Sequence, residues 1–173
     1  MIIVFTGNGK GKTTAALGQA IRVLGQDKRV LMIQFIKSGM VSGEHKFLEK
    51  FKVIQSKFQI ISTGKGFVKI LDDKTSFSVH KKAAQDALKL AQKAILSKKW
   101  DLIILDEINV AVGLKLVKAS DVLKILKPAT ADIILTGRGA PKIFIKYADL
   151  VTEMKEIKHP FQKGQLAKMG VDF

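Results

Sequence analysis

The sequence contains no cysteine among its 173 residues. This absence excludes a disulfide, a thiolate metal site and a cysteine-ligated iron–sulfur cluster. It fits a reducing compartment. Because Met1 is followed at once by a predicted strand, we also expect no signal peptide and a cytoplasmic location.

Histidine is scarce, and long apolar runs are missing. The three histidines, His45, His80 and His159, do not have the short spacing of zinc ligands. No arrangement of serine and histidine suggests a nucleophilic triad. No apolar run approaches the roughly 18–20 residues that cross a bilayer, so we expect no membrane association.

Acidic side chains are also few. There are 15 Asp and Glu against 30 Lys and Arg, which gives a formal charge of +15. Such a charge favours an anionic ligand, either a polyphosphate or a nucleic acid. The lysines are dispersed and form no arginine-rich run, so a lysine-rich solvated surface explains the charge equally well.

What the sequence does contain is a glycine-rich loop near its start, T-G-N-G-K-G-K-T-T at residues 6–14. It lies between an apolar run at 2–5 and an apolar-periodic segment at 15–24, which is the strand–turn–helix context of a phosphate-binding loop. Glycines let the backbone approach an anion, and the amides and the helix start attract it. We predict that Lys12 reaches the outer phosphates and that the Thr13 hydroxyl faces Mg²⁺.

The loop departs from the usual pattern G-x-x-x-x-G-K-[ST] in one position. Position 6, where the first glycine should stand, is Thr6, and the glycine is displaced to Gly7. We therefore interpret the loop as a variant that holds phosphates differently; the alternative is a glycine-rich turn with incidental lysines. The loop residues assigned to the nucleotide are Thr6, Gly7, Asn8, Gly9, Lys10, Gly11, Lys12, Thr13 and Thr14.

Predicted strands and helices alternate along the chain. The strands are expected at 2–6, 29–36, 58–62, 100–105, 132–136 and 150–157. The helices are expected at 13–24, 44–51, from Ser78 or His80 to 97, 120–126 with Ser120 as the N-cap, and 141–147 with Pro141 in the first turn. The alternation predicts one α/β domain over residues 1–173, with a mainly parallel sheet and helices on both faces. Ligands bind beyond the carboxyl ends of such strands, so five loops should share one edge: 6–13, 37–43, 63–67, 106–109 and 137–139.

An acidic pair ends one predicted strand, in L-I-I-L-D-E. Carboxylates at this place can hold Mg²⁺ or its water, so Asp106 and Glu107 are candidate metal residues, although an acid can also cap the next turn. Arg138 stands between two glycines after another strand and is a candidate anion contact. Asn109 is a candidate supporting group. Phe67 lies in a glycine-containing loop, either exposed or folded onto the core.

Several segments together resemble one family, the ATP:corrinoid adenosyltransferases of cobalamin synthesis and salvage. They are G-N-G-K-G-K-T-T (7–14), Q-F-I-K (34–37) with Gly43-Glu44, G-x-G-F (64–67), L-D-E-I-N (105–109), T-G-R-G-A-P (136–141), A-D-L-V-T-E-M (148–154) and K-H-P-F (158–161). They cover nearly the whole chain in order. The first loop is shared with many NTPases, whereas the segments from 136 to 161 are more specific.

The resemblance implies a RecA-like P-loop fold and a homodimer. In such enzymes a corrinoid reduced to Co(I) attacks the 5′ carbon of ATP and the triphosphate leaves. Family members hold ATP in the reverse sense, which suits the displaced glycine. Lys12 and Mg²⁺ on Thr13 and Glu107 would stabilise the leaving charge, and Asn8 and Arg22 would position the nucleotide. With neither cysteine nor a flavin motif present, an external electron donor such as a reduced flavoprotein is implied.

The corrinoid side of the resemblance contains one departure. In the family, a Phe and a Trp in a G-x-G-F-x-W loop are associated with excluding the lower axial ligand of cobalt. Phe67 matches the Phe, and Lys69 stands where the Trp is expected. We assign both positions to the corrinoid, and the departure concerns how the corrinoid is seated rather than the ATP site.

Two other activities compete with adenosyl transfer. A phosphoryl-transfer enzyme could use the same loop and would release ADP and phosphate instead of triphosphate. An ATP-gated nucleic-acid binder would suit the charge of +15 and would bind with a steep salt dependence. The motif set favours adenosyl transfer over both.

Overall fold

The computed structural model describes residues 1–37, 42–66, 68 and 74–171. Its centre is a sheet of six parallel strands in the order β3-β2-β4-β5-β1-β6. The strands are β1 (Ile2–Thr6), β2 (Val30–Gln34), β3 (Phe58–Ser62), β4 (Leu102–Asp106), β5 (Asp132–Thr136) and β6 (Leu150–Glu153).

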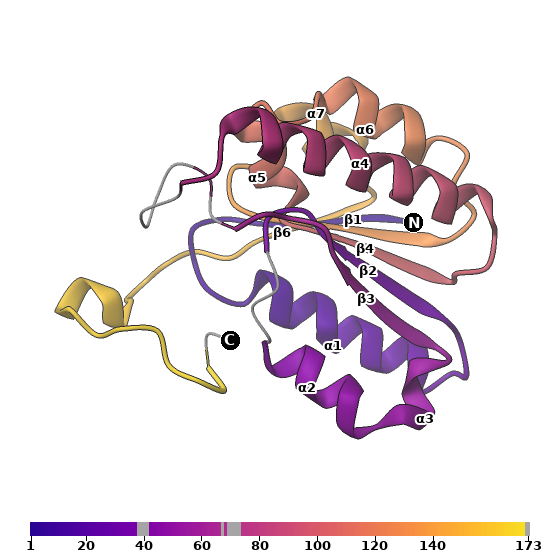
Figure 1. Cartoon of the computed structure of the whole chain (residues 1–173), viewed down its shortest axis with the longest axis horizontal. Helices are drawn as coiled ribbons and strands as arrows, with labels where there is room; N and C mark the ends of the chain where they lie inside the picture. Colours follow the sequence, from indigo (N-terminus) through magenta and orange to yellow (C-terminus); the bar gives the residue numbers. More distant parts are fainter. Residues whose placement is uncertain (38–41, 67, 69–73, 172–173) are drawn as a thin grey trace.

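Helices cover both faces of the sheet (Figure 1). On one face lie α1 (Lys12–Leu24), α2 (Gly43–Lys50) and α3 (Lys52–Gln55). On the other lie α4 (Phe77–Leu96), α5 (Ile108–Gly113), α6 (Ala119–Leu126) and α7 (Lys142–Tyr147). A short 3₁₀ helix, Pro160–Lys163, follows in the C-terminal segment. The predicted α/β architecture, a parallel sheet between two helical layers, is confirmed.

The central strands are almost wholly apolar because both of their faces are covered. In β2, Leu31 and Ile33 belong to the core beneath α4 and α6, whereas Val30 and Met32 belong to the core beneath α1. Successive side chains of a strand point to opposite faces, so one apolar run supplies both cores.

The register of the parallel strands places polar residues side by side at their carboxyl ends. Gln34 pairs with Asp106, and Phe5 pairs with Thr136. Since β5 lies between β1 and β4, Thr136 stands between the glycine-rich loop after β1 and the carboxylate of Asp106. The predicted gathering of loops at the carboxyl edge therefore has a structural basis in strand order.

Several predicted boundaries were wrong. The strands expected at 29–36, 100–105 and 150–157 differ from β2, β4 and β6; β6 is shorter because it pairs only with Ile3–Thr6 of β1. Helix α4 begins at Phe77, one residue before Ser78 and three before His80, the two predicted starts. The short helices α3 and α5 were not predicted.

Two predicted helix starts also need correction. Ser120 is not the N-cap of α6: Lys118 is, and its carbonyl accepts bonds from the amides of Asp121 and Val122, which places Ser120 inside the first turn. Pro141 precedes α7 as its N-cap instead of beginning it.

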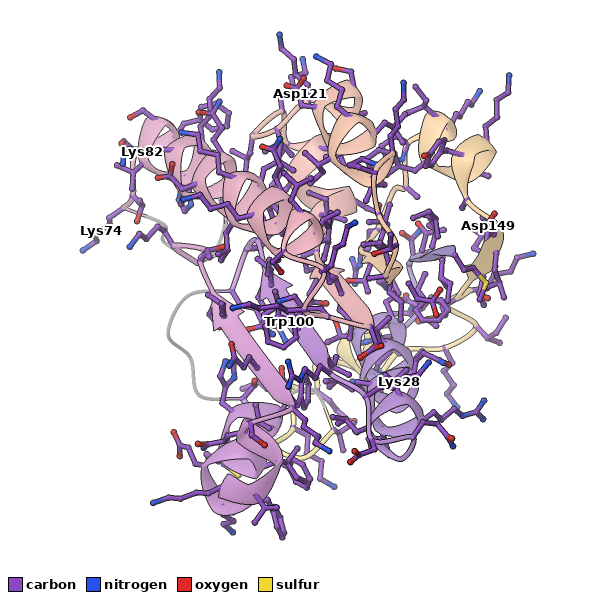
Figure 2. The ribbon with its side chains drawn as sticks, turned by 90° about the vertical axis from the view of Figure 1, so that its right-hand side faces the viewer. Lys28, Lys74, Lys82, Trp100, Asp121 and Asp149 are labelled. Atoms are coloured by element: carbon purple, nitrogen blue, oxygen red, sulfur yellow. The ribbon has the colours of Figure 1, made fainter. Side chains whose placement is uncertain are left out.

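The lysines are spread over the surface rather than gathered. Figure 2 shows Lys28, which follows α1, on the opposite side of the view from Lys74 and Lys82, which lie before and within α4. None of the helices in the described part of the chain is both long and apolar enough to cross a membrane.

Candidate functional site

The glycine-rich loop is pressed against the chain that follows β6. Gly7 and Gly11 have φ of 97° and 114°, values that favour glycine. A Cβ on Gly7 would lie 2.3 Å from the carbonyl oxygen of Met154, and one on Gly9 would lie 2.7 Å from that of Lys155. The glycine displaced to position 7 thus has a physical reason, because the backbone of 154 leaves no room there for a side chain.

Backbone hydrogen bonds fix this contact. The Met154 amide donates to the Thr6 carbonyl at 2.8 Å, and the Gly9 amide donates to the Met154 carbonyl at 2.7 Å. The Thr6 hydroxyl accepts from the Ala140 amide at 3.0 Å. The expectation that consecutive loop amides all point at the phosphates is therefore corrected for Gly9, whose amide the protein itself uses.

Lys12 is the buried cation of the loop. Its side chain is 8% exposed, and Nζ donates to the Gly9 carbonyl at 2.6 Å. Burial lowers the pKa of Lys12; the nearby Glu107 carboxylate opposes this shift and Arg138 adds to it. A poorly solvated positive charge at this place would be stabilised by an anion.

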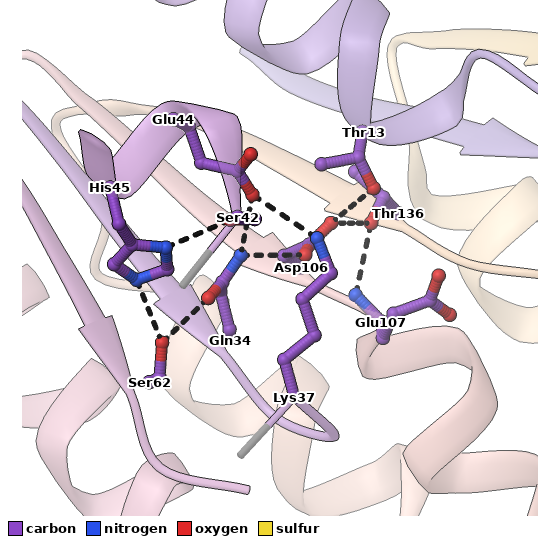
Figure 3. A network of polar contacts seen from close by, with 10 residues as sticks. All are labelled: Thr13, Gln34, Lys37, Ser42, Glu44, His45, Ser62, Asp106, Glu107 and Thr136. Carbon is purple, nitrogen blue, oxygen red and sulfur yellow. Dashed lines mark hydrogen bonds and ion pairs between the residues drawn. The ribbon is translucent and has the colours of Figure 1, made fainter. Parts of the chain in front are cut away.

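Asp106, at the end of β4, is the buried carboxylate of the site. Its Oδ1 accepts hydrogen bonds from the hydroxyls of Thr13 and Thr136, each at 2.8 Å (Figure 3). Burial raises the pKa of Asp106, against the charge of Lys37 and the two hydroxyl bonds. Because Thr13 gives its one hydroxyl hydrogen to Asp106, the lone pairs of the Thr13 hydroxyl oxygen are left for a ligand. Asp106 is thus placed to orient Thr13.

Thr136, at the end of β5, was missed by the sequence reasoning. Its hydroxyl donates to Asp106 and accepts from the Glu107 amide at 2.9 Å. One side chain therefore fixes both the buried carboxylate and the backbone of the next residue. The signal that could have found it is its place at a strand end, directly before Gly137-Arg138.

Glu107 turns its carboxylate away from Asp106 (Figure 3). Its φ is 61°, and it caps the start of α5. A Cβ on Gly137 would lie 3.0 Å from Glu107 Oε2, so glycine at 137 makes room for the carboxylate. Burial and the neighbouring Asp106 raise the pKa of Glu107, while Lys12 opposes the shift. The charges of Lys12, Lys37 and Arg138 thus all act on this carboxylate.

Asn109 is wholly buried beside this group. Its Nδ2 donates to the Gly137 carbonyl at 3.0 Å, whereas Oδ1 has no hydrogen-bond partner among the described residues. An unpaired buried acceptor costs about 1–3 kcal/mol. Asn109 therefore supports the Gly137 turn and retains an acceptor for a donor group.

A second polar cluster lies across Asp106 from Thr13. Glu44 Oε1 accepts from Lys37 Nζ at 3.1 Å and from Gln34 Nε2 at 3.3 Å. Burial alone would raise the pKa of Glu44, but the Ser42 hydroxyl and the charge of Lys37 together hold that pKa below its ordinary value. Gln34, Lys37 and Glu44 belong to segments that carry the family resemblance, but the sequence alone indicated no role for them.

The structure gathers some predicted residues and not others. Thr6, Lys12, Thr13, Asp106 and Glu107 meet at one edge, with the Arg138 charge close enough to act on Lys12 and Glu107. The other predicted residues lie on the exposed rim of this edge, farther along α1, or outside the residues that the structure describes. Asn8, Lys10 and Thr14 are exposed residues of the rim, and Phe67 and Lys69 lie outside the described residues.

Arg22 is not part of the gathered group. It is exposed in the last turn of α1. Nine residues of helix separate it from Thr13 by about 13 Å along the axis. A role for Arg22 toward the nucleotide stays a prediction.

The donor set suits a hard cation. In the part of the chain that the structure describes, no three His, Cys, Asp or Glu residues form a group that could hold a metal. The Thr13 hydroxyl and the Glu107 carboxylate offer oxygen ligands at the mouth of the loop. Such a small number of protein oxygens is sufficient for Mg²⁺, because this ion keeps several waters and takes substrate phosphates as its other ligands.

The whole chain matches one protein family. The model described as "ATP:corrinoid adenosyltransferase BtuR/CobO/CobP" covers residues 1–173. The corrinoid adenosyltransferase of Escherichia coli K12 is 35% identical over 175 residues, covering 100% of this chain and 85% of that protein. That of Sinorhizobium sp is 36% identical over 176 residues, with 100% and 80% covered. The corrinoid adenosyltransferase CobA of Salmonella typhimurium is 34% identical over 180 residues, with 100% and 85% covered.

A solved structure shares the fold. The flagellar accessory protein FlaH from Methanocaldococcus jannaschii superposes with a TM-score of 0.58 at 16% identity. The match covers 88% of this chain and 69% of FlaH. At this identity the likeness concerns the fold alone.

Proposed function

The chain belongs to the ATP:corrinoid adenosyltransferase family, and we propose that the loop of residues 6–13 holds the triphosphate of ATP during the transfer. Its activity is corrinoid adenosyl transfer, with ATP and a corrinoid as substrates.

One observation carries the assignment of the loop. Lys12 holds a buried ammonium group over the loop, and burial lowers its pKa. The start of α1 lies directly beside it, with Gly11 as the N-cap. A helix N-terminus and a desolvated cation together form a site for a polyanion.

The chemistry asks for positioning and charge stabilisation. The Co(I) centre of the substrate supplies an electron pair to the 5′ carbon of ATP, a Co–C bond forms, and the C–O bond breaks toward the triphosphate. No proton needs to move to a protein group. The protein must align the carbon with the cobalt and stabilise the charge that grows on the leaving oxygens. Lys12 and the helix start meet the second need.

We assign Mg²⁺ to the Thr13 hydroxyl and the Glu107 carboxylate, with Asp106 acting through Thr13. When bound, this ion would offset the negative charge of the triphosphate. Thr136 supports the arrangement because it fixes Asp106 and the Glu107 amide at once. Arg138 would add a second cation for the phosphates, at the exposed rim of the site.

Other parts of the function stay predictions of the sequence. Phe67 and Lys69 are proposed to contact the corrinoid, and Asn8 and Arg22 the nucleotide. An external reductant such as a reduced flavoprotein would supply Co(I). A homodimer, a single domain over residues 1–173 and a cytoplasmic location complete the proposal.

The products of the reaction test the proposal. The enzyme is incubated with ATP, Mg²⁺ and a chemically reduced corrinoid, and phosphorus NMR follows the products. Triphosphate should appear in step with the adenosylated corrinoid. Release of ADP and phosphate instead would contradict attack at carbon.

A magnesium titration tests the metal assignment. The Glu107→Gln variant should need about tenfold or more Mg²⁺ for half-maximal rate, the size of effect expected when a group supporting a metal is lost. Asp121→Asn, which alters an exposed carboxylate on α6, is the matched control and should leave the titration unchanged. An unchanged titration in Glu107→Gln would remove Glu107 from the metal site.

A further inference from the structure

The segment at residues 63–66 is clamped onto the end of β2. The amide and the hydroxyl of Thr63 both donate to the Gln34 carbonyl, at 3.1 and 3.0 Å. The Gly66 amide donates to the Ile36 carbonyl at 3.1 Å. A Cβ on Gly64 would lie 2.1 Å from that same carbonyl oxygen. The chain that leads into position 67 therefore has little freedom to move relative to β2.

The side chain of Gln34 connects this clamp to the carboxylates. Gln34 is wholly buried, and its Nε2 faces Asp106 Oδ2 at 3.4 Å and Glu44 Oε1 at 3.3 Å. Its Oε1 accepts from the Ser62 hydroxyl at 2.6 Å. A flipped amide would turn its oxygen toward two carboxylates, so the orientation of Gln34 is fixed.

The chain of hydrogen bonds continues outward from Gln34 through Ser62 and His45 (Figure 3). Ser62 donates its one hydroxyl hydrogen to Gln34. At the 3.1 Å contact with His45 Nε2, the Ser62 oxygen must therefore accept a hydrogen bond. His45 therefore carries a proton on Nε2. Its Nδ1 meets the Ser42 hydroxyl at 2.8 Å, just before α2. One chain of hydrogen bonds thus runs from Asp106 through β2 and β3 to the start of α2.

We propose that Gln34, Ser62 and His45 are positioning residues that couple nucleotide binding to the segment at 63–66, and through it to the corrinoid. Asp106 is the shared group: Oδ1 holds Thr13, and Oδ2 faces Gln34. A cation at Thr13 draws on the same carboxylate that orients the Gln34 amide. This inference rests on the proposed placing of the nucleotide at Thr13 and of the corrinoid at position 67.

Chemically, the coupling has a simple basis. Hydrogen bonds in a chain shielded from water polarise one another, so a change of charge at one end alters the strength of the others. The final acceptor of this chain is the buried carboxylate of Asp106, and Gln34, Ser62 and His45 Nε2 each donate a hydrogen toward it. The three residues act through their neighbours and need no contact with either substrate.

The experiment removes one link and measures coupling. Cob(II)alamin is the probe, and its dissociation constant is measured by absorbance with and without MgATP. In the unaltered enzyme MgATP should tighten cob(II)alamin binding about fivefold or more, the lower range for coupled sites. In Ser62→Ala and in His45→Ala this factor should fall to near one, while the dissociation constant of MgATP alone changes less than about twofold.

Two variants serve as controls. Ser62→Thr keeps the hydroxyl and should retain most of the coupling. Ser97→Ala removes a serine hydroxyl outside the network, at the end of α4, where it donates to the Ala94 carbonyl. This variant should leave the coupling intact. Because Ser62 and His45 are only partly buried, folded variants are expected, and a melting curve checks this.

Each outcome decides the inference. Full coupling in both Ser62→Ala and His45→Ala would overturn it, and so would an equal loss of MgATP affinity, which indicates a purely structural role. Absence of any MgATP effect in the unaltered enzyme would also overturn it. Failure of the proposed nucleotide site is distinguishable, because it would appear as normal MgATP affinity in Lys12→Ala.

Discussion

Two regions of the site meet at Asp106 and are built by different means. In the half that we propose holds the nucleotide (the nucleotide half), residues 6–13, 106–107 and 136–140, the glycine-rich loop is shaped by backbone contacts with the chain after β6, which leave no space for a Cβ on Gly7 or Gly9. The network that we propose acts toward the corrinoid (the corrinoid-side network), formed by Gln34, Ser42, Glu44, His45 and Ser62, is joined by side-chain hydrogen bonds.

The two regions should therefore tolerate different substitutions. A backbone cradle depends on the absence of Cβ atoms at a few positions and is insensitive to which side chains surround it. A side-chain network depends on the donors and acceptors present and can be retuned by single substitutions. We therefore expect large effects from changes to the loop in the nucleotide half, whereas changes in the corrinoid-side network should alter coupling and leave the affinity for MgATP nearly unchanged.

The largest effect is expected from Lys12→Ala. Loss of a preorganised charge facing the leaving group should lower turnover by about 10²–10³-fold, or roughly 3–4 kcal/mol of transition-state stabilisation. Lys28→Ala, which removes an exposed lysine after α1, is the control and should keep normal turnover. Steady-state kinetics with saturating ATP and corrinoid make the measurement, and a loss below tenfold in Lys12→Ala would contradict its role.

Gly7→Ala tests the backbone cradle itself. Its Cβ would meet the Met154 carbonyl at a left-handed φ, and we expect a loss of about 2–4 kcal/mol of unfolding free energy. Gly139 also has a positive φ, 64°, but its Cβ would meet nothing within 4 Å. Gly139→Ala should therefore lose only about 1–2 kcal/mol. Urea unfolding of both variants compares them, and equal losses would refute the clash.

Thr136→Val tests the link between the two regions. The substitution keeps the shape but removes the hydroxyl that serves Asp106 and the Glu107 amide. We expect a loss of about 1–3 kcal/mol in stability, with weaker MgATP binding. Thr136→Ser should recover both. If valine and serine behave alike in calorimetric titration with MgATP, the hydroxyl has no such role.

The smallest effect concerns pH in the enzyme without ligands. A carboxyl group whose folded pKa is raised contributes stability below its unfolded pKa, and this stability is lost as pH rises through the folded pKa. Burial raises the pKa of Glu107, so Glu107→Gln should be more stable than the parent at neutral pH, by on the order of 1 kcal/mol.

The stability difference between Glu107→Gln and the parent should shrink as pH falls toward 4. Thermal melts of both proteins over this range measure it. A difference that stays constant with pH would mean that Glu107 titrates alike in the folded and unfolded chain.

Much of the fold could be predicted because its causes are local. The central strands are continuous apolar runs, and the glycine-rich loop and the acidic pair at 106–107 each follow one directly. Parallel strands bring such segments to one edge, so the meeting of Lys12, Thr13 and Asp106 followed from pattern and topology.

The parts of the site that could not be predicted depend on contacts between segments that are distant in the sequence. Thr136 matters only because β5 lies between β1 and β4, and the need for glycine at 7 comes from the backbone of Met154. His45 and Ser62 are ordinary polar residues until β2, β3 and α2 bring them together. Their spacing in the sequence holds no motif that would have identified the chain of hydrogen bonds.

The binding of the triphosphate by the loop can be seen in a structure of the enzyme with MgATP. We expect triphosphate oxygens within hydrogen-bond distance of Lys12 Nζ and of the amides at the start of α1, with the cation on Thr13 and Glu107. A triphosphate bound elsewhere, with Lys12 still donating only to the Gly9 carbonyl, would contradict it.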